Sequence, residues 1–446
     1  MIGVVRLIFL QLIFFVAFSS GAQAGDITLP QPDAKFSRAD ERSVALGQLL
    51  FYDAILSGNK SVSCATCHHP AFGTSDGVSL AIGDGGMGLG PKRSIDPKNV
   101  PEIRVGRNAP SLFNLGAAQF TSLFHDGRLE ADPARPSGIR SPLEDEMVGG
   151  FNSVLSAQAM FPVLSADEMA GHYSENEISK AVRLGQLTIE GGAWDLIATR
   201  VAAIPEYREM FDKVIGNTRP IEFTDIANAI ADFIAFEWRA DNSPFDRYLR
   251  GENALSAKAL AGMELFYGKA NCVACHSGQF QTDHDFHAIA MVQIGPGKTE
   301  RFETHTRDIG RMRVTGNEDD AYKFRTPSLR NIGLSAPYGH AGAYATLEGV
   351  VRHHLNPVAS LMNYDRNNAI LPDLPDAVDF SILDDRAMLG EIANANELEP
   401  VELSDSEVAD LLAFLDSLTD PLSRAGFRLG IPASVPSGLP VEGKEQ

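Results

Sequence analysis

The stretch from Leu46 to Pro70, LGQLLFYDAILSGNKSVSCATCHHP, joins an apolar helical pattern to a Cys-x-x-Cys-His motif. Its apolar residues recur at helical spacing, which predicts a helix that runs into the turn carrying the cysteines. A second stretch of the same design, AGMELFYGKANCVACH, spans Ala261 to His276. The repeat indicates an internal duplication in which each half of the chain has its own site.

The two motifs contain every cysteine of the chain: Cys64, Cys67, Cys272 and Cys275. A helical turn with this spacing presents two thiols to the two vinyl groups of a haem, and the next residue, a histidine, reaches the iron. We therefore expect two covalently bound haem c groups, the first ligated by His68 and the second by His276. The alternatives are a zinc site built from the four cysteines or two redox disulfides, although zinc sites do not need a histidine directly after each pair.

The composition is that of a globular protein. The chain has 446 residues, of which 44% are hydrophobic and 22% charged, enough for two domains of ordinary size and too apolar for a disordered chain. Lys and Arg number 38 against 58 Asp and Glu, a formal net charge of −20. This charge disfavours nucleic acids and anionic membrane surfaces, and it favours a basic partner.

The N-terminus has the pattern of a signal peptide. Arg6 is followed by an apolar run from Leu7 to Phe18, and Ala22-Gln23-Ala24 offers a cleavage site. We expect residues 1–24 to be removed, which leaves an exported chain with no membrane span. An uncleaved anchor is the alternative, but the run is shorter than the ~20 residues that a span requires.

The rest of the sequence predicts a mainly α fold with two cytochrome c-like haem domains and long irregular loops. Thr224 is expected to cap a helix that reaches Trp238 and links or opens the second half, and Ser404 is expected to form a capping box with Glu407. We place the N-terminal haem domain at residues 25–215, the C-terminal haem domain at 216–425 and a tail at 426–446. The tail is polar and rich in Pro and Gly, so we expect it to be mobile or draped over the surface.

At this point the sequence resembles the bacterial di-haem cytochrome c peroxidase family, which includes the MauG-type enzymes, over most of residues 45 to 420. Besides the two haem motifs, the resemblance rests on five stretches: RNAPSLFN (Arg107 to Asn114), HDGRLE (His125 to Glu130), DEM (Asp145 to Met147), FRTPSLRNIGLSAPYGHAGAYATLEGVVRHH (Phe324 to His354) and LSDSEVADLLAFLDSLTD (Leu403 to Asp420). It implies an open haem in the N-terminal half, where peroxide binds, and a six-coordinate haem in the C-terminal half that stores or relays an electron.

The resemblance also indicates which haem is open. In the family a distal histidine often lies sixteen residues after the first proximal one, in a Gly-rich loop that moves on activation. Here that position is Asp84, in Ala81-Ile82-Gly83-Asp84-Gly85-Gly86. We therefore expect the first haem to be five-coordinate without reductive activation. His69 is adjacent to the proximal ligand and cannot reach the far face, so we expect a surface or hydrogen-bonding role for it.

Peroxide cleavage needs a group that takes a proton from one oxygen and returns it to the other, within hydrogen-bond reach. In the family this group is the glutamate of an E-M motif, which maps to Glu146, with Glu144 as the fallback. The alternative is that Glu146 is one of three acids on a solvated loop.

The second haem departs from the family pattern. The distal ligand of the peroxidases is a methionine, and that of MauG a tyrosine, fourteen residues after the histidine of the P-Y-x-H segment. That histidine is His340, and the ligand position is His354. A bis-histidine haem has a lower potential than a His/Met haem. His353 is the neighbouring candidate, and an open iron or ligation by Met362 is a further alternative.

A second departure precedes the D-G-R motif, where family members commonly carry a tryptophan between the haems. This chain has His125 there, and its two tryptophans, Trp194 and Trp238, lie elsewhere. Coupling between the haems is then weaker or uses Tyr338, Tyr344 or the backbone. His125 is either a hydrogen-bonding residue at the domain interface or a buried structural histidine.

The family also holds a calcium ion between the haems, through an asparagine and carbonyl groups near the P-Y-x-H segment. The matching positions are Asn108, Ser335 and Pro337, and oxygen ligands of this kind suit a hard cation. An asparagine before Ala-Pro also serves as a plain turn residue.

Three functions remain open. The first is a periplasmic peroxidase that reduces hydrogen peroxide to water with electrons from a small, basic cytochrome c or cupredoxin, and that forms a homodimer as family members often do. The second is a MauG-like oxidase that uses peroxide to modify a residue of a partner protein. The third is a di-haem electron carrier without catalytic turnover.

Overall fold

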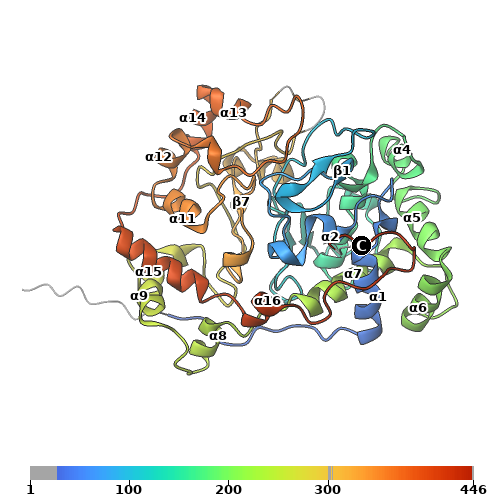
Figure 1. Cartoon of the computed structure of the whole chain (residues 1–446), viewed down its shortest axis with the longest axis horizontal. Coiled ribbons are helices and arrows are strands. Elements are labelled where there is room, and N and C mark those ends of the chain that lie inside the picture. The colour runs from blue at the N-terminus through green and yellow to red at the C-terminus, as the bar shows by residue number, and fades with distance from the viewer. Residues whose placement is uncertain (1–27, 300–302, 304, 444–446) are drawn as a thin grey trace, which may run out of the picture.

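The structure is a computed structural model that describes residues 28–299, 303 and 305–443. The expected signal peptide lies outside the described residues. The fold is mainly helical with little strand, as the sequence predicts. Figure 1 shows two groups of helices side by side, one built from each half of the chain.

The first half is built around the helix pair α1 and α7. Both contribute to one large buried cluster, with Leu46, Leu50 and Phe51 from α1 and Ile230 and Phe233 from α7. The other helices of this half surround the pair (Figure 1). Its helices are α1 (Glu41–Tyr52), α2 (Cys64–Cys67), α3 (Val154–Ala159), α4 (Glu177–Arg183), α5 (Ala193–Ala202), α6 (Pro205–Ile215) and α7 (Phe223–Glu237).

The second half repeats this design with α9 and α15, whose Met263, Phe266, Leu411 and Phe414 share another buried cluster. A third cluster, with Val292, Tyr338 and Ile392, lies under α11 to α14. The helices of this half are α8 (Pro244–Leu249), α9 (Ala257–Tyr267), α10 (Met312–Thr315), α11 (Leu347–Leu355), α12 (Pro357–Met362), α13 (Ser381–Asp384), α14 (Arg386–Asn394), α15 (Asp405–Asp416) and α16 (Pro421–Ala425).

The duplication extends to the closest contact within each helix pair. A methyl group on Gly47 of α1 would overlap the carbonyl oxygen of Ala229 in α7, and one on Gly262 of α9 would overlap that of Asp410 in α15. The same added methyl groups would lie 2.9 Å from Cβ of Phe233 and of Phe414, respectively. The internal repeat predicted from the sequence is therefore present in the packing.

The helix expected to open the second half differs from the prediction in two respects. It begins at Phe223 with Glu222 as its N-cap, because the Asp225 carboxylate accepts the Glu222 N–H (2.9 Å), whereas Thr224 lies inside the first turn. Its buried side chains also belong to the first cluster. We propose that the boundary between the halves follows Trp238 and does not lie at residue 216. The capping box of Ser404 and Glu407 at the start of α15 is confirmed.

Strands are short and local. β1 (Gly86–Met87) pairs with β2 (Ser94–Ile95) inside the Gly-rich loop, and β6 (Phe286–His287) pairs with β7 (Phe324–Arg325). β3 (Ser122–Leu123), β4 (Leu129–Ala131) and β5 (Ile139–Arg140) form a small antiparallel sheet. These hairpins give fixed shapes to long connections that the sequence presents as irregular.

Both ends of the described chain cross between the halves. At the N-terminal end, Leu29 packs on the cluster of the second half and Phe36 on that of the first. At the other end, residues 426–443 return over the first half (Figure 1), where Val435 is buried. Among the described residues, no helix has the length and apolar character to cross a membrane.

Candidate functional site

The first Cys-x-x-Cys-His motif forms the short helix α2. The side chain of Thr66 accepts the Ser63 N–H (3.0 Å) at its start, and His68 ends it. Burial raises the pKa of the Cys64 thiol to about 12.

The second motif has the same character, since burial raises the pKa of the Cys272 thiol to about 12. All four cysteines are free of disulfides. Among the described residues, the one group of three side chains that could hold a metal ion is Cys275, Asp283 and His287, which includes a single cysteine. The structure therefore offers no four-cysteine zinc site in its described part.

Three histidines are oriented as metal ligands. His68 Nδ1 donates to the carbonyl of Thr74 (2.9 Å), His276 Nδ1 to Gln281 (3.0 Å) and His354 Nδ1 to Val350 (2.8 Å). Each bond fixes the tautomer that leaves Nε2 with a lone pair, which is the arrangement that metal-bound histidines adopt. Burial lowers the pKa of all three imidazoles, that of His276 to about 4, and so favours their neutral form.

His276 and His354 face each other across the second site. Their ring centres are 6.3 Å apart. A metal–imidazole bond of about 2 Å places the metal roughly 3 Å from each ring centre, so two rings at this separation can share one metal ion. The residues present therefore fit a bis-histidine haem.

The neighbouring His353 has different surroundings. It is fully buried, its Nε2 donates to the carbonyl of Ile289 (2.9 Å), and its Nδ1 accepts from the hydroxyl of Tyr344 (2.8 Å). Both nitrogens are engaged, so His353 has a structural role. Met362, the other alternative ligand, is 49% exposed at the end of α12.

Asp84 is engaged in hydrogen bonds within the protein. Its fully buried carboxylate accepts hydrogen bonds from Asn59, Ser61 and Asn99, each 2.8 Å long. These bonds tie the Gly-rich loop to the segment that precedes α2. His69 is buried as well, and its Nδ1 accepts the N–H of Ala71 (3.2 Å), so of the two expected roles the hydrogen-bonding one holds.

Glu146 lies at the end of the 3₁₀ turn η4 (Glu144–Glu146), and its side chain is exposed. In the same turn Glu144 and Asp145 form ion pairs with Arg135 (2.7 and 3.0 Å). These surroundings are those of the solvated acidic loop that the sequence left as the alternative.

Sequence reasoning missed a second carboxyl group, Glu168, in the π-helical turn η6 (Ala166–Ala170). A methyl group on Gly83 would overlap the carbonyl oxygen of Asp167 and lie 2.8 Å from Cα of Glu168, so this turn packs on the Gly-rich loop. Burial raises the pKa of Glu168, against the nearby charges of Lys298 and Arg128. The Gly58 N–H donates to the Met169 carbonyl (2.8 Å), which ties this turn to the segment that precedes the first haem motif.

A signal for Glu168 is present in the sequence. The tripeptide Asp-Glu-Met occurs twice, at residues 145–147 and 167–169. The methionine is buried in both copies (Met147 7%, Met169 4% exposed), and the copies differ at the glutamate, which is exposed at position 146 and half-buried at position 168.

The two halves meet at a buried ion-pair network. Arg107 of the first half binds Asp126 (2.6 Å) and, across the interface, Asp308 (2.6 Å). His125 donates from Nε2 to the carbonyl of Asn108 (3.0 Å), and its own carbonyl accepts the Arg325 N–H (2.7 Å). His125 is half-buried, and of the two expected roles the hydrogen-bonding one at the interface between the halves holds.

The possible calcium ligands lie near this interface. Asn108 donates from Nδ2 to the carbonyls of Val78 (2.8 Å) and Ser79 (3.2 Å), and its backbone N–H bonds to the carbonyl of His340 (2.8 Å). Ser335 and Pro337 precede His340 in the same segment, with a cis bond at Ala336–Pro337. Because Nδ2 donates to these two carbonyls, the Asn108 side-chain oxygen makes neither of these bonds, as a cation ligand would require.

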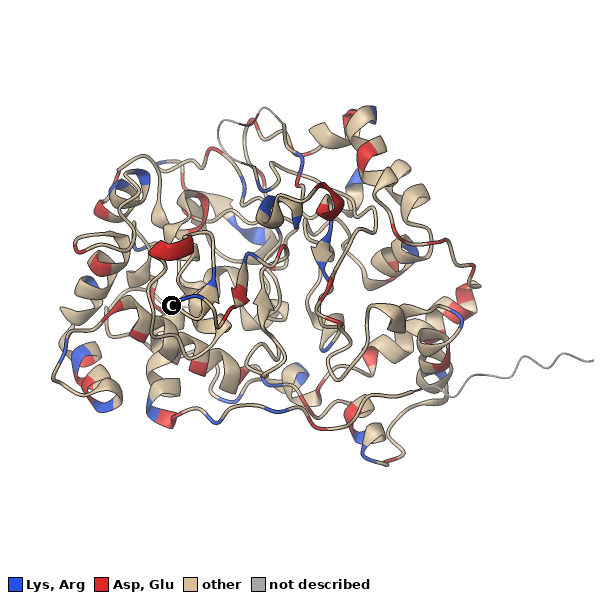
Figure 2. Cartoon of the chain, turned by 180° about the vertical axis from the view of Figure 1, so that it is seen from behind, with Lys and Arg blue, Asp and Glu red and all other residues tan. Residues whose placement is uncertain are grey.

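The tryptophans are structural. Trp194 donates from Nε1 to the carbonyl of Met160 (2.9 Å), and Trp238 packs against Phe51, both within the first buried cluster. Tyr338 and Tyr344 belong to the second half, where they form an isolated antiparallel β-bridge with each other. The ribbon of Figure 2 marks Asp and Glu positions on helices of both halves, in line with the net charge of −20.

Comparison with known proteins agrees with this site. A family model described as di-haem cytochrome c peroxidase matches residues 41–254. The methylamine utilization protein MauG of Methylorubrum extorquens is 30% identical over 390 residues, which cover 87% of this chain and 81% of that protein. The cytochrome c551 peroxidase of Nitrosomonas europaea is 30% identical over 334 residues, which cover 75% of this chain and 78% of that protein.

Solved structures give the same result. A MauG-like protein associated with microbial copper homeostasis superposes with a TM-score of 0.55 at 28% identity, over 89% of this chain and 94% of that chain. The di-haem peroxidase BthA of Burkholderia thailandensis has the same TM-score at 21% identity, which supports the fold alone. The chain therefore belongs to the di-haem cytochrome c peroxidase and MauG family, and it is a peroxidase-type oxidoreductase with two haem groups.

Proposed function

We propose that the protein is an exported di-haem peroxidase that reduces hydrogen peroxide to water, with the first haem as the open, peroxide-binding one. Cys64 and Cys67 would attach this haem and His68 would ligate it. When bound, the haem supplies the iron that takes up peroxide and exchanges electrons with it. Cys272 and Cys275 would attach the second haem, with His276 and His354 on its two faces.

The observation that carries the proposal is the combination of Asp84 and Glu168 beside the first site. The Asp84 carboxylate accepts hydrogen bonds from Asn59, Ser61 and Asn99, so the residue at the family's distal-histidine position is engaged within the protein. Glu168 keeps a proton more readily than a solvated glutamate because burial raises its pKa. A carboxyl group poised in this way can move a proton between the two peroxide oxygens.

The Thr74 carbonyl gives His68 its orientation, because it holds Nδ1–H and directs Nε2 to the iron site. The Gln281 and Val350 carbonyls do the same for His276 and His354. Two imidazole ligands give the second haem a lower potential than a thioether would, which suits an electron relay that feeds a more oxidising centre.

Substitution of the two candidate glutamates tests the proposal. In Glu168→Gln the rate of reaction of the haem-loaded protein with hydrogen peroxide should fall by about 10²- to 10⁴-fold, the usual contribution of general acid–base catalysis. The matched variant Glu146→Gln should react as the unaltered protein does. A loss confined to Glu146→Gln would return the role to the residue that the sequence indicated. An electron carrier would show no peroxide turnover before or after either change.

The MauG-like alternative is favoured by His354, which stands where the peroxidases have methionine. Stopped-flow absorbance after one equivalent of peroxide, with fully ferric protein and no reductant, separates the two enzymes. Immediate changes at both haems would favour oxidation of a partner protein. A reaction that waits for one electron would favour the conventional peroxidase cycle, and it would contradict a permanently open first haem.

The electron donor is proposed to be a small basic cytochrome c or cupredoxin, because opposite net charges speed the encounter of two proteins. The association rate should then fall steeply with ionic strength. We also propose a periplasmic location, with a mature N-terminus at Gly25, and a homodimer. N-terminal sequencing of the exported protein and light scattering test these two statements.

A calcium ion held by the Asn108 side chain and the carbonyls of Ser335 and Pro337 is part of the proposal. Oxygen donors of this kind bind calcium with several waters. Metal analysis should find one calcium per chain, and Asn108→Ala should lose it. Retention of calcium by this variant would exclude the site.

A further inference from the structure

The C-terminal segment, residues 426–443, forms a strap along the first half. Near its start, the N–H groups of Leu429 and Gly430 both donate to the Glu237 carboxylate (2.8 Å each) at the end of α7. Further along, the Ser437 hydroxyl donates to Asp53 (2.7 Å) after α1. The strap is therefore bonded to both helices of the central pair, although it follows the last helix of the second half.

The end of the strap reaches the first haem motif. Glu442 accepts a hydrogen bond from the hydroxyl of Thr66, which stands between Cys64 and Cys67. Its carboxylate also lies 3.7 Å from the Arg93 guanidinium. Burial raises the pKa of Glu442, while its bond to Thr66 and the charge of Arg93 oppose the rise.

Arg93 in turn holds the Gly-rich loop. Its guanidinium donates to the carbonyls of Ile82 (2.5 Å), Gly83 (2.7 Å) and Gly88 (2.5 Å). The Arg93 side chain is only 4% exposed, so these bonds are made away from water. Gly83 is the residue whose backbone packs on Glu168.

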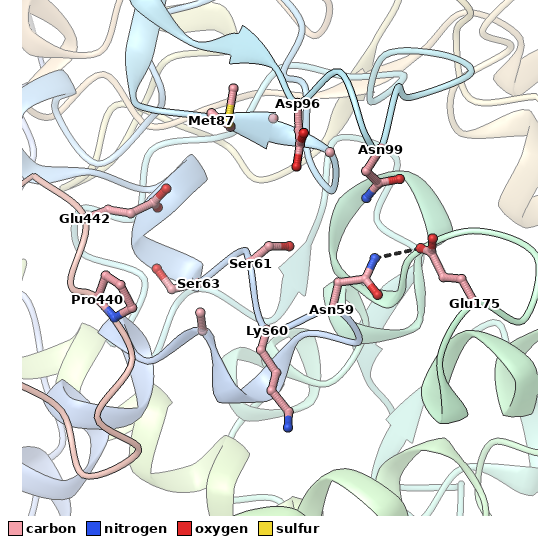
Figure 3. A pocket seen from close by; sticks show the side chains of 13 residues that line it. Asn59, Lys60, Ser61, Ser63, Met87, Asp96, Asn99, Glu175, Pro440 and Glu442 are labelled. Atoms are coloured by element: carbon pink, nitrogen blue, oxygen red, sulfur yellow. Dashed lines mark hydrogen bonds between the residues drawn. The ribbon is translucent and has the colours of Figure 1, made fainter.

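One side of this assembly opens to solvent. A pocket of about 550 Å³ lies between the strap and the loop, and Figure 3 shows Glu442, Pro440 and Ser63 on one side of it and Asn59, Asn99 and Glu175 on the other. Glu442 is thus a wall of the pocket as well as a partner of Arg93. The contact between the strap and the Gly-rich loop therefore borders a pocket that water can enter.

We infer that the strap is a positioning element for the first site: Glu442 fixes Arg93, and Arg93 holds the Gly-rich loop in the shape that seats Glu168. This inference rests on the proposed function only through Glu168. The link between the strap and the loop stands on the contacts alone. Glu442 and Arg93 are positioning residues, since they act through the loop.

Hydrogen exchange of the haem-loaded protein tests the link. The N–H of Gly86 bonds to Gly83 (3.1 Å) and that of Asp96 to Gly85 (2.8 Å), so peptides over residues 81–96 report the loop. In Arg93→Gln and in Glu442→Gln these amides should exchange at least about tenfold faster, while peptides of α1 and α7 keep their protection and so verify the fold. In the double variant the two effects should not add, because both residues act on one chain of contacts.

The matched control is Glu402→Gln, an exposed glutamate near the start of α15, which should leave exchange unchanged. Unchanged loop exchange in both test variants would overturn the inference. The rate of the peroxide reaction should fall in proportion to loop opening. Faster exchange with an unaltered peroxide rate would also overturn the positioning role, whereas the proposed function itself is decided separately by Glu168→Gln.

Discussion

His353 and His354 are adjacent on α11, yet their imidazoles have different partners. His353 uses both nitrogens, on Ile289 and Tyr344, whereas His354 uses one on Val350 and turns the other toward His276. Because successive residues of a helix point about 100° apart, two neighbouring histidines cannot both face one site. Their roles can therefore be separated by substitution.

In His354→Met the second haem should change from bis-histidine to His/Met ligation, and its reduction potential should rise because a thioether stabilises the reduced iron. In His353→Phe the potential and the ferric spectrum should stay unchanged. The same variant should lose about 1–3 kcal/mol of unfolding free energy, since it leaves the Ile289 carbonyl without its donor, whereas the Tyr344 hydroxyl keeps its bond to Ser360 (2.8 Å). Redox titration and EPR of the ferric protein check this, and loss of the bis-histidine signal in His353→Phe would reverse the assignment.

For single residues, the spacing of side chains along the sequence predicts those that lie close together in one motif. The two cysteine pairs with their histidines are read from positions along the chain, and His354 is indicated by the family resemblance through its distance from His340. Glu146 stays a prediction of the sequence, and Glu168 is the alternative that we propose, because Asp-Glu-Met occurs twice and the sequence does not show which glutamate is the less exposed. Glu168 becomes visible only when its turn packs on Gly83, a contact between segments 85 residues apart.

At the level of elements, the helix pairs α1/α7 and α9/α15 depend on one glycine each. Gly47→Ala places a methyl group against the Ala229 carbonyl and Phe233, which neither helix can relieve without moving apart. Overpacking of this kind costs about 1–3 kcal/mol, and more where backbone is struck. Gly390 of α14 has nothing within 4 Å of the added methyl group, so Gly390→Ala should be neutral or stabilise by up to about 1 kcal/mol.

Denaturant unfolding of the haem-loaded variants measures both effects. Equal stability of the Gly47 and Gly390 variants would contradict the view that α1 and α7 are in close contact at Gly47.

The capping box at Ser404 could be predicted from the sequence, because it uses two residues only three positions apart. The sequence predicted Thr224 as the N-cap of α7, whereas the N-cap is Glu222, whose backbone and side chain form a capping box with Asp225. The packing of α7 in the first half depends on contacts with α1, which no local sequence pattern reveals.

At the scale of the whole molecule, the interface between the two halves is stabilised by the ion pairs of Arg107 with Asp126 and Asp308. The pairs are almost fully buried, with the side chains of Asp126 and Asp308 each 1% exposed. Removal of one partner from a buried pair leaves an uncompensated charge, which costs about 3–5 kcal/mol. Asp308→Asn should lose this much stability at pH 7, whereas Asp384→Asn, in an exposed pair with Arg366, should change it by less than about 1 kcal/mol.

Acid should weaken the same interface in two stages. Burial lowers the pKa of His125 to about 4 and that of His340 to about 3, so between pH 6.5 and 4 the unfolded chain binds protons that the folded one refuses. Each such histidine lowers the unfolding free energy by up to about 1.4 kcal/mol per pH unit.

Burial opposes ionisation of Asp126 and Asp308, but the charge of Arg107 outweighs this effect and lowers the pKa of both carboxyl groups. Their contribution to the unfolding free energy is therefore complete above pH 4 and is lost below it. The unfolding free energy of the haem-loaded protein should fall from pH 7 to 5.5 and again to pH 4. Asp308→Asn should show the same fall, because both histidines remain. Below pH 4 the variant should lose less unfolding free energy than the unaltered protein, because it lacks the Asp308 carboxylate. Parallel curves below pH 4 would mean that the Arg107 network does not join the halves.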